Sequence, residues 1–171
     1  MPFDIAPKAG DWEVIAEVEV EADCDYVEFT GLDINSDKAY VIFIVRKNPL
    51  SVDDALKMYV NGDTDDANYY VQYILAHETT IGGDRLNFAS TGTSTANTAD
   101  FRVIFLTLDT NGYARAIIFT NKDVPSSVDI LLIMWAKATT ETNITTIRFQ
   151  ASNAGGIGAG SKFILCRVKR P

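Results

Sequence analysis

The segment NGDTDDANYYVQYILAH, residues 61–77, joins an acidic turn to an alternating strand. Its first half is rich in Asn, Gly, Asp and Thr, the residues that favour chain reversal. In its second half Tyr69, Val71, Tyr73 and Leu75 recur at every second position, so an extended chain places them on one face. The segment predicts a strand that is entered from a loop, with the turn fixing the register of the strand.

The same two-residue alternation recurs along the rest of the chain. We expect about ten strands, separated by turn signals every 8 to 12 residues or so, as in sandwiches and jelly rolls. The clearest local prediction is a hairpin of residues 101–108 and 113–120 around Asp109–Gly112, because Asn-Gly accepts the positive φ angles of a tight turn. Further strands are expected over residues 12–21, 26–30, 39–46, 56–60, 84–89, 129–138, 143–150 and 160–168.

Length and composition favour one folded unit. The chain has 171 residues and 47% hydrophobic content, which is enough for a core of its own. The pattern predicts no helix of normal length. We therefore expect an all-β fold: a single-domain antiparallel β-sandwich, similar to a jelly roll.

Two segments carry more specific expectations. Trp12, Val14, Ala16, Val18 and Val20 alternate with Ile15 and four Glu residues, which predicts one core face and one wet face. Residues 90–99 hold only small and polar side chains apart from alanine, so we expect an exposed, mobile loop there.

Three predicted strands are apolar on both faces. They are residues 40–45, 101–108 and 130–135. The outer face of a sandwich is normally polar, so these strands need a second cover. Loops or a short helix would supply one; burial between subunits is the interpretation we favour. It predicts a homo-oligomer, by preference a trimer, with Phe43, Phe105, Trp135 or their opposite-face neighbours at the interface.

Charge and composition exclude several classes of partner. The net charge is −8, the pI is about 4.5, and the basic residues are scattered, so no nucleic-acid partner is expected. The first ten residues lack a signal-peptide pattern, and no apolar run approaches the 18 or so residues of a membrane span. We expect no membrane association and synthesis in the cytoplasm. Cys24 and Cys166 are expected to be reduced and packed.

Catalytic and metal motifs are weak. His77 is the only histidine, no nucleophile elbow surrounds a serine, and the Gly155–Gly160 stretch is followed by Ser161-Lys162, the reverse of the phosphate-loop order. We expect no enzyme activity and no cofactor. Asp63, Asp65 and Asp66 resemble the first half of a calcium loop, but Asp66 stands where that loop needs Gly and Gln72 where it needs Glu.

Several short motifs resemble a group of small structural proteins of phages and archaeal viruses. The motifs are Trp12, residues 29–32 (FTGL), residues 58–64 (MYVNGDT) with residues 68–70 (NYY), and residues 158–165 (GAGSKFIL). The proteins of this group are tail, fibre or capsid-surface components. The resemblance implies a jelly-roll sandwich, often trimeric, built into a virion, with no catalytic residues. Leu165-Cys166 departs from the Leu-Tyr with which such proteins often close.

Two functions follow as expectations. In the first, the chain is a virion structural protein that contacts other virion proteins and displays its end loops. Host-surface glycans are the ligands that these loops could bind. In the second, it is a carbohydrate-binding module in which exposed aromatics stack on pyranose rings. Glycan cleavage by paired carboxylates is a distant third. The candidate stacking residues are Trp12, Tyr26, Tyr70 and Tyr113, and the candidate loop residues are Asp63, Asp65, Asn68, Thr93 and Asn97.

Overall fold

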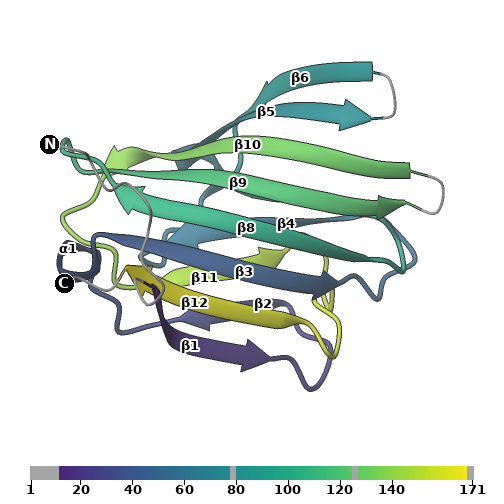
Figure 1. Ribbon diagram of the computed structural model, residues 1–171, viewed down its shortest axis with the longest axis horizontal. Helices are drawn as coiled ribbons and strands as arrows, with labels where there is room; N and C mark the ends of the chain where they lie inside the picture. The colour runs from purple at the N-terminus through teal and green to yellow at the C-terminus, as the bar shows by residue number, and fades with distance from the viewer. Residues whose placement is uncertain (1–11, 78–79, 125–126, 169–171) are drawn as a thin grey trace, which may run out of the picture.

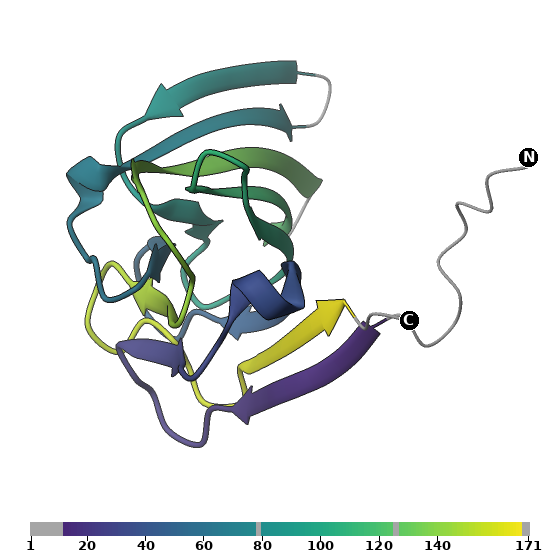
Figure 2. The same ribbon diagram turned by 90° about the vertical axis from the view of Figure 1, so that its left-hand side faces the viewer.

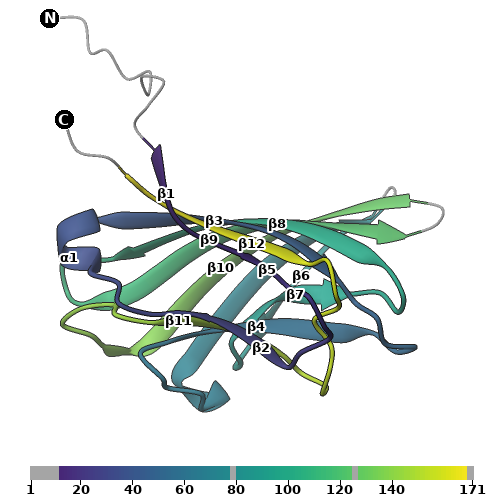
Figure 3. The ribbon, with the colours of Figure 1, turned by 90° about the horizontal axis from the view of Figure 1, so that it is seen from below.

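A computed structural model describes residues 12–77, 80–124 and 127–168, which form two antiparallel sheets packed face to face (Figures 1 and 3). The larger sheet contains, in spatial order, β1 (Trp12–Glu19), β12 (Lys162–Val168), β3 (Ala39–Lys47), β8 (Ala99–Leu108), β9 (Tyr113–Val124), β10 (Ser127–Thr140), β5 (Tyr69–His77) and β6 (Thr80–Leu86). The smaller sheet contains β2 (Tyr26–Phe29), β11 (Ile147–Ala151), β4 (Asp54–Val60) and β7 (Ser90–Ser94). The predicted single-domain antiparallel β-sandwich is confirmed.

Local chemistry explains the strand boundaries. β5 covers residues 69–77, the predicted range. The β8–β9 hairpin turns where predicted, because Gly112 has a φ of +84° and the Asp109 carboxylate accepts from the backbone N–H groups of Asn111 and Tyr113, both at 2.9 Å. β4 contains the strand expected over residues 56–60 and begins two residues earlier, at Asp54.

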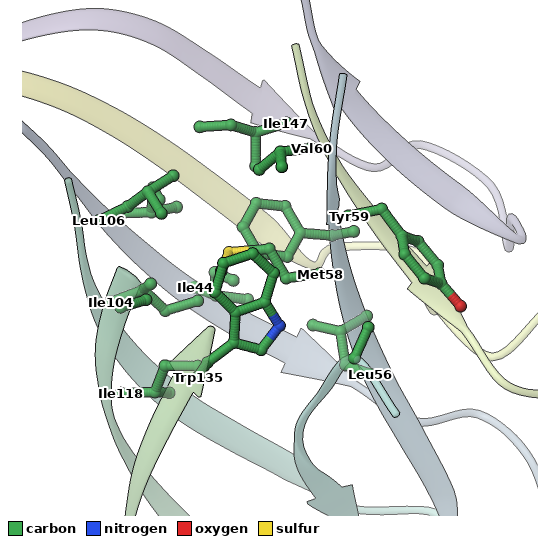
Figure 4. Close-up of a cluster of buried hydrophobic side chains, with 14 of the residues drawn as sticks. Ile44, Leu56, Met58, Tyr59, Val60, Ile104, Leu106, Ile118, Trp135 and Ile147 are labelled. Atoms are coloured by element: carbon green, nitrogen blue, oxygen red, sulfur yellow. The ribbon is translucent and has the colours of Figure 1, made fainter. Parts of the chain in front are cut away.

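The core lies between the two sheets. Inward-facing aliphatic and aromatic side chains from both sheets meet there (Figure 4). The Trp135 and Tyr69 rings are 5.2 Å apart, and Phe149 of the small sheet lies 5.6 Å from Phe163 of the large sheet. Each such side chain, buried from water, contributes about 1.5–3 kcal/mol to folding.

The expectation for the first strand is wrong in its first half. The β1–β12 register shifts between Val14 and Ala16, which marks a β-bulge. A bulge adds one residue to a strand and reverses which side chains face inward. Ala16 and Val18 therefore pack against the core, whereas Trp12 and Val14 lie on the opposite face, 45% and 58% exposed.

The predicted loop over residues 90–99 is wrong in its first half. Residues 90–94 form β7, and Thr91 and Ser94 are fully buried. The Thr91 hydroxyl donates to the Leu56 carbonyl at 2.8 Å, so a small polar side chain is satisfied inside the sandwich. Hydrophobicity cannot reveal such a strand.

Two smaller elements differ from expectation. The strand expected over residues 84–89 begins earlier, as β6, and ends at Leu86. The polar run after Gly31 contains one helical turn, α1 (Ile34–Asp37), because the Asp33 carboxylate caps the N–H groups of Asn35 and Ser36. No helix in the described ranges is long and apolar enough to cross a membrane.

Candidate functional site

The most unusual surface is the side of the eight-stranded sheet that faces away from the small sheet, called here the outer face (Figure 3). Fifteen large hydrophobic side chains in the described residues are exposed, and thirteen of them lie on the outer face. They are Trp12, Val14, Phe43, Val45, Tyr70, Ile74, Ile81, Phe101, Phe105, Ile117, Phe119, Ile130 and Met134.

The strand register lines these side chains up in rows across the sheet. Phe43 lies opposite Val103, and Val103 lies opposite Phe119. The row continues through Leu132 to Ile74. Neighbouring strands thus add their apolar side chains to one continuous surface. Soluble monomers rarely expose a patch of this extent unless it is an interaction site.

The prediction of two-faced strands is confirmed for the strands that the structure describes. In β3, Ile42 and Ile44 are fully buried, whereas Phe43 and Val45 are 37% and 43% exposed on the outer face. Phe105 is also on the outer face, 42% exposed.

Trp135 was a wrong interface candidate. It is 1% exposed and belongs to the core, with its ring against Tyr69. The alternation of β10 gives the reason, because Ile133 and Trp135 point inward while Met134 points outward.

A groove of about 700 Å³ crosses the outer face near one end of the strands. Its lining runs from Trp12 on β1 to Arg85 on β6. Small side chains at Ala39, Thr107 and Ala136 leave the space open. Of the four candidate stacking aromatics, Trp12 and Tyr70 line this groove.

The acidic turn lies at the end of the sandwich that carries α1, the end that faces the viewer in Figure 2. The Asp63 carboxylate lies 3.0 Å from Lys137 Nζ and accepts from Asn68 Nδ2 at 3.0 Å. Burial by itself raises the pKa of Asp63, but the hydrogen bonds from Lys137 and Asn68 outweigh it and leave that pKa below its usual value. The Tyr69 hydroxyl donates to the Asp63 carbonyl at 2.6 Å, which ties the turn to the start of β5.

The other two calcium candidates, Asp65 and Asp66, form hydrogen bonds with different parts of the protein. Asp66 accepts from Lys57 Nζ at 2.6 Å and from the Tyr59 hydroxyl at 2.9 Å. Asp65 accepts from the Ala67 N–H at 3.0 Å. In the described ranges, no group of three or more His, Cys, Asp or Glu is placed to hold a metal ion. The turn carboxylates position the chain; they do not converge on a common centre.

The two predicted recognition loops lie at opposite ends of the sandwich. Tyr69 pairs with Lys137 at the end marked by Ala39, whereas Ala99 pairs with Lys47 at the other end. The structure therefore does not bring Asp63, Asp65 and Asn68 together with Thr93 and Asn97. Thr93 is exposed on β7, and Asn97 is exposed in the short connection that follows, with a φ of +55°.

Asn97 borders a surface hollow of about 410 Å³, called here the Asn97 hollow. The hollow is also lined by Asp23, Lys47 and Thr98, together with backbone around Gly158. These groups offer a cation, carboxylate, amide and hydroxyl to a ligand.

A buried charge cluster was missed by the sequence reasoning. Arg46 and Asp54 pair with both side chains fully buried, and Arg102 lies 2.9 Å from Asp100. The Ser94 hydroxyl connects the pairs, accepting from Arg46 and donating to Asp100. Burial lowers the pKa of Arg102 to about 10.

The cluster joins the two sheets at the end opposite the acidic turn. A signal was present, because Arg46 is in phase with the buried Ile42 and Ile44, and Arg102 with the buried Ile104. A charge in phase with core positions indicates a buried ion pair.

The two cysteines do not meet. Both thiols are free. The backbone of Cys24 forms an isolated β-bridge with Ile157, whereas Cys166 lies on β12. Burial raises the pKa of both thiols. The side chain of His77 lies outside the described residues.

Comparisons with known proteins find no family and no curated relative. No protein-family description matches the sequence, and no curated protein sequence does. Among solved structures, a mutant of alginate lyase Aly36B in complex with alginate tetrasaccharide is similar, with a TM-score of 0.33 and 11% identity over 94% of this chain and 86% of that one. A Shewanella oneidensis MR-1 protein of unknown function has a TM-score of 0.28 and 11% identity over 95% of this chain and 78% of that one.

Proposed function

We propose that this chain is a structural subunit of a virion that assembles with copies of itself through the outer face. The observation that carries the proposal is that, among the residues the structure describes, thirteen of the fifteen exposed large hydrophobic side chains lie on that face. The expected assembly is a trimer, and the chain is assigned no enzymatic activity.

The size of the outer face supports self-assembly. Eight strands about 4.8 Å apart make a sheet about 34 Å wide, and seven residues along a strand cover about 23 Å. The resulting area, about 800 Å², is what one partner contributes to a standard stable interface.

The assignment to a virion rests on the sequence motifs that resemble phage and archaeal-virus structural proteins. Residues 58–64 and 68–70 of those motifs build the acidic turn and its junction with β5. In an assembly held by the outer face, the loops at the two ends of the sandwich remain available to other virion proteins or to a host surface.

Sedimentation of the purified chain at micromolar concentration tests the proposal. The wild type should sediment as three copies of the 18.8 kDa chain. Phe43→Ser combined with Phe119→Ser should shift it to the monomer, because both rings lie in the centre of the outer face. Val52→Ser is the matched control: Val52 is 55% exposed but lies between β3 and β4, away from this face. A wild-type monomer contradicts the proposal.

The polar side chains at the rim of the Asn97 hollow favour carbohydrate binding as a second candidate function. The aromatic platforms are less suitable, since an arginine guanidinium already lies over Tyr26 at 3.8 Å, over Tyr70 at 5.2 Å and over Tyr113 at 5.3 Å. Hydroxyls of a sugar would instead meet Lys47, Asn97 and Thr98.

A glycan array tests this second candidate. Asn97→Gly with Thr98→Ala should abolish any signal that the wild type gives, and the left-handed φ at residue 97 makes glycine compatible with the backbone. Thr93→Ala, at the exposed position of β7, is the control. Equal binding by the double variant would exclude the hollow.

A further inference from the structure

The groove on the outer face is a built feature of the sheet. Its floor follows one row of cross-strand neighbours: Ala39 lies opposite Thr107, Thr107 opposite Arg115, and Arg115 opposite Ala136. Trp12 stands at one end of this row and Tyr70 at the other. Because the side chains between the two rings are short apart from Arg115, the row forms a trough.

One wall of the groove is aliphatic and aromatic. It is the next row of cross-strand neighbours, formed by Val41, Phe105, Ile117 and Met134. These side chains offer no hydrogen-bond partner to a hydroxyl, and burying an unpaired hydroxyl costs free energy. The wall therefore suits a hydrocarbon chain better than a sugar.

The part of the groove that extends from β9 to β6 is cationic. Arg85 lies on β6 with its guanidinium over the Tyr70 ring, and Gln72 is its cross-strand neighbour. Arg115 lies on the floor, where Asp109 holds its guanidinium at 3.2 Å and offsets part of its charge. A ligand anion would meet Arg85 first, with Gln72 as a further donor.

We propose that the groove binds a free long-chain carboxylate. The hydrocarbon chain lies along Ile117 and Phe105 with its tail toward Trp12, and the carboxylate meets Arg85. The Arg85 guanidinium lies over Tyr70 on β5, and the distance from β5 to the strand of Phe105, three strand spacings, is about 14 Å, which accommodates an extended acyl chain. A volume of about 700 Å³ is that of a typical ligand site.

Charge selects the free acid over a lipid bilayer as the source of the chain. The net charge of −8 repels an anionic membrane surface, whereas a single carboxylate interacts with the local arginines. A second copy of the chain is the competing occupant, because the groove belongs to the face proposed for assembly.

Titration of the full chain with dodecanoate, followed by tryptophan fluorescence, tests the proposal. Trp12 lines the groove and Trp135 lies beneath it, so a bound acyl chain changes the emission. Saturable binding is expected, and dodecanol should bind at least tenfold more weakly because it lacks the charge. Arg85→Gln should weaken dodecanoate binding about tenfold. Arg148→Gln, which removes an arginine stacked on Tyr26 of the other sheet, is the matched control and should bind normally.

A second variant keeps the test independent of charge. Ala136→Phe fills the trough and should abolish binding, with a thermal melt to verify folding. Absence of saturable binding, equal affinity for dodecanol, or unchanged binding by folded Ala136→Phe overturns the proposal. Sedimentation of the same samples separates the two proposals: an oligomer that does not bind dodecanoate overturns only this inference and leaves a second copy in the groove, whereas a monomer that binds it overturns only the assembly.

Discussion

The two faces of the eight-stranded sheet are similar in composition and differ in what covers them. The inner face places Ile44, Ile104 and Ile118 against the small sheet, where they are fully buried. The outer face places Phe43, Phe105 and Phe119 in the same strands, and none of the described residues forms such a layer over them. Alternation in a sequence therefore shows which faces of a strand are apolar. Whether another layer buries such a face depends on the whole fold and its assemblies.

The largest effect should come from exchanging large for small side chains on neighbouring residues of β10. Trp135→Ala removes a core side chain and should lower the free energy of unfolding by about 3–5 kcal/mol. Met134→Ala, on the outer face, should change it much less in the monomer but weaken self-association. Urea denaturation of dilute protein measures both values. Equal losses in the monomer would contradict the distinction between the faces.

Charged pairs provide the second comparison. Asp54→Ala leaves Arg46 buried without its carboxylate and should cost about 3–5 kcal/mol. Glu19→Ala breaks an exposed pair with Lys162 and should leave the melting temperature unchanged within error. Calorimetry of the two variants decides. A small loss for Asp54→Ala would show that water reaches the cluster.

Asn68→Ala should cost about 1 kcal/mol, because it removes the donor that Asn68 gives to Asp63 in the turn before β5. Thermal unfolding measures the loss, and Asn111→Ala, in an exposed hairpin turn, serves as a comparison. An unchanged melting temperature would mean that Lys137 alone holds the turn.

The smallest effect concerns pH. The pKa of Asp63 is lowered in the folded chain, so its ionised form contributes stability that is present above the unfolded pKa of about 3.9 and is lost as pH falls through the folded value. Asp63→Asn should therefore reduce the loss of stability as the pH falls below about 4. Melting curves across that range test the sign, and a steeper loss in the variant would contradict it.

Local patterns were sufficient for most of the fold. β5 and the β8–β9 hairpin follow from period-two alternation and turn chemistry within about 20 residues. β7 did not follow, because Thr91 and Ser94 are buried through hydrogen bonds and an ion cluster whose partners lie far away in the sequence. The bulge after Val14 depends on pairing with β12, the last strand, which no local pattern contains.

Parts of the candidate site could also be predicted from local sequence patterns. Phe43 and Phe105 could be predicted because a second apolar face is visible in one strand. Trp135 was misplaced because, in a strand that is apolar on both sides, the sequence does not say which side faces inward. The groove could not be predicted, because it depends on strand pairing. Pairing places the small side chains of Ala39, Thr107 and Ala136, from three strands, in one row across the sheet.

Oxidation footprinting of methionine tests the central claim, burial of the outer face between copies, most directly. Met134 is 52% exposed in the single chain, whereas Met58 is fully buried in the core and serves as the internal control. Mass spectrometry after peroxide treatment should find Met134 protected at micromolar concentration and oxidised after dilution, with Met58 protected throughout. Rapid oxidation of Met134 at every concentration, beside a protected Met58, would contradict the account.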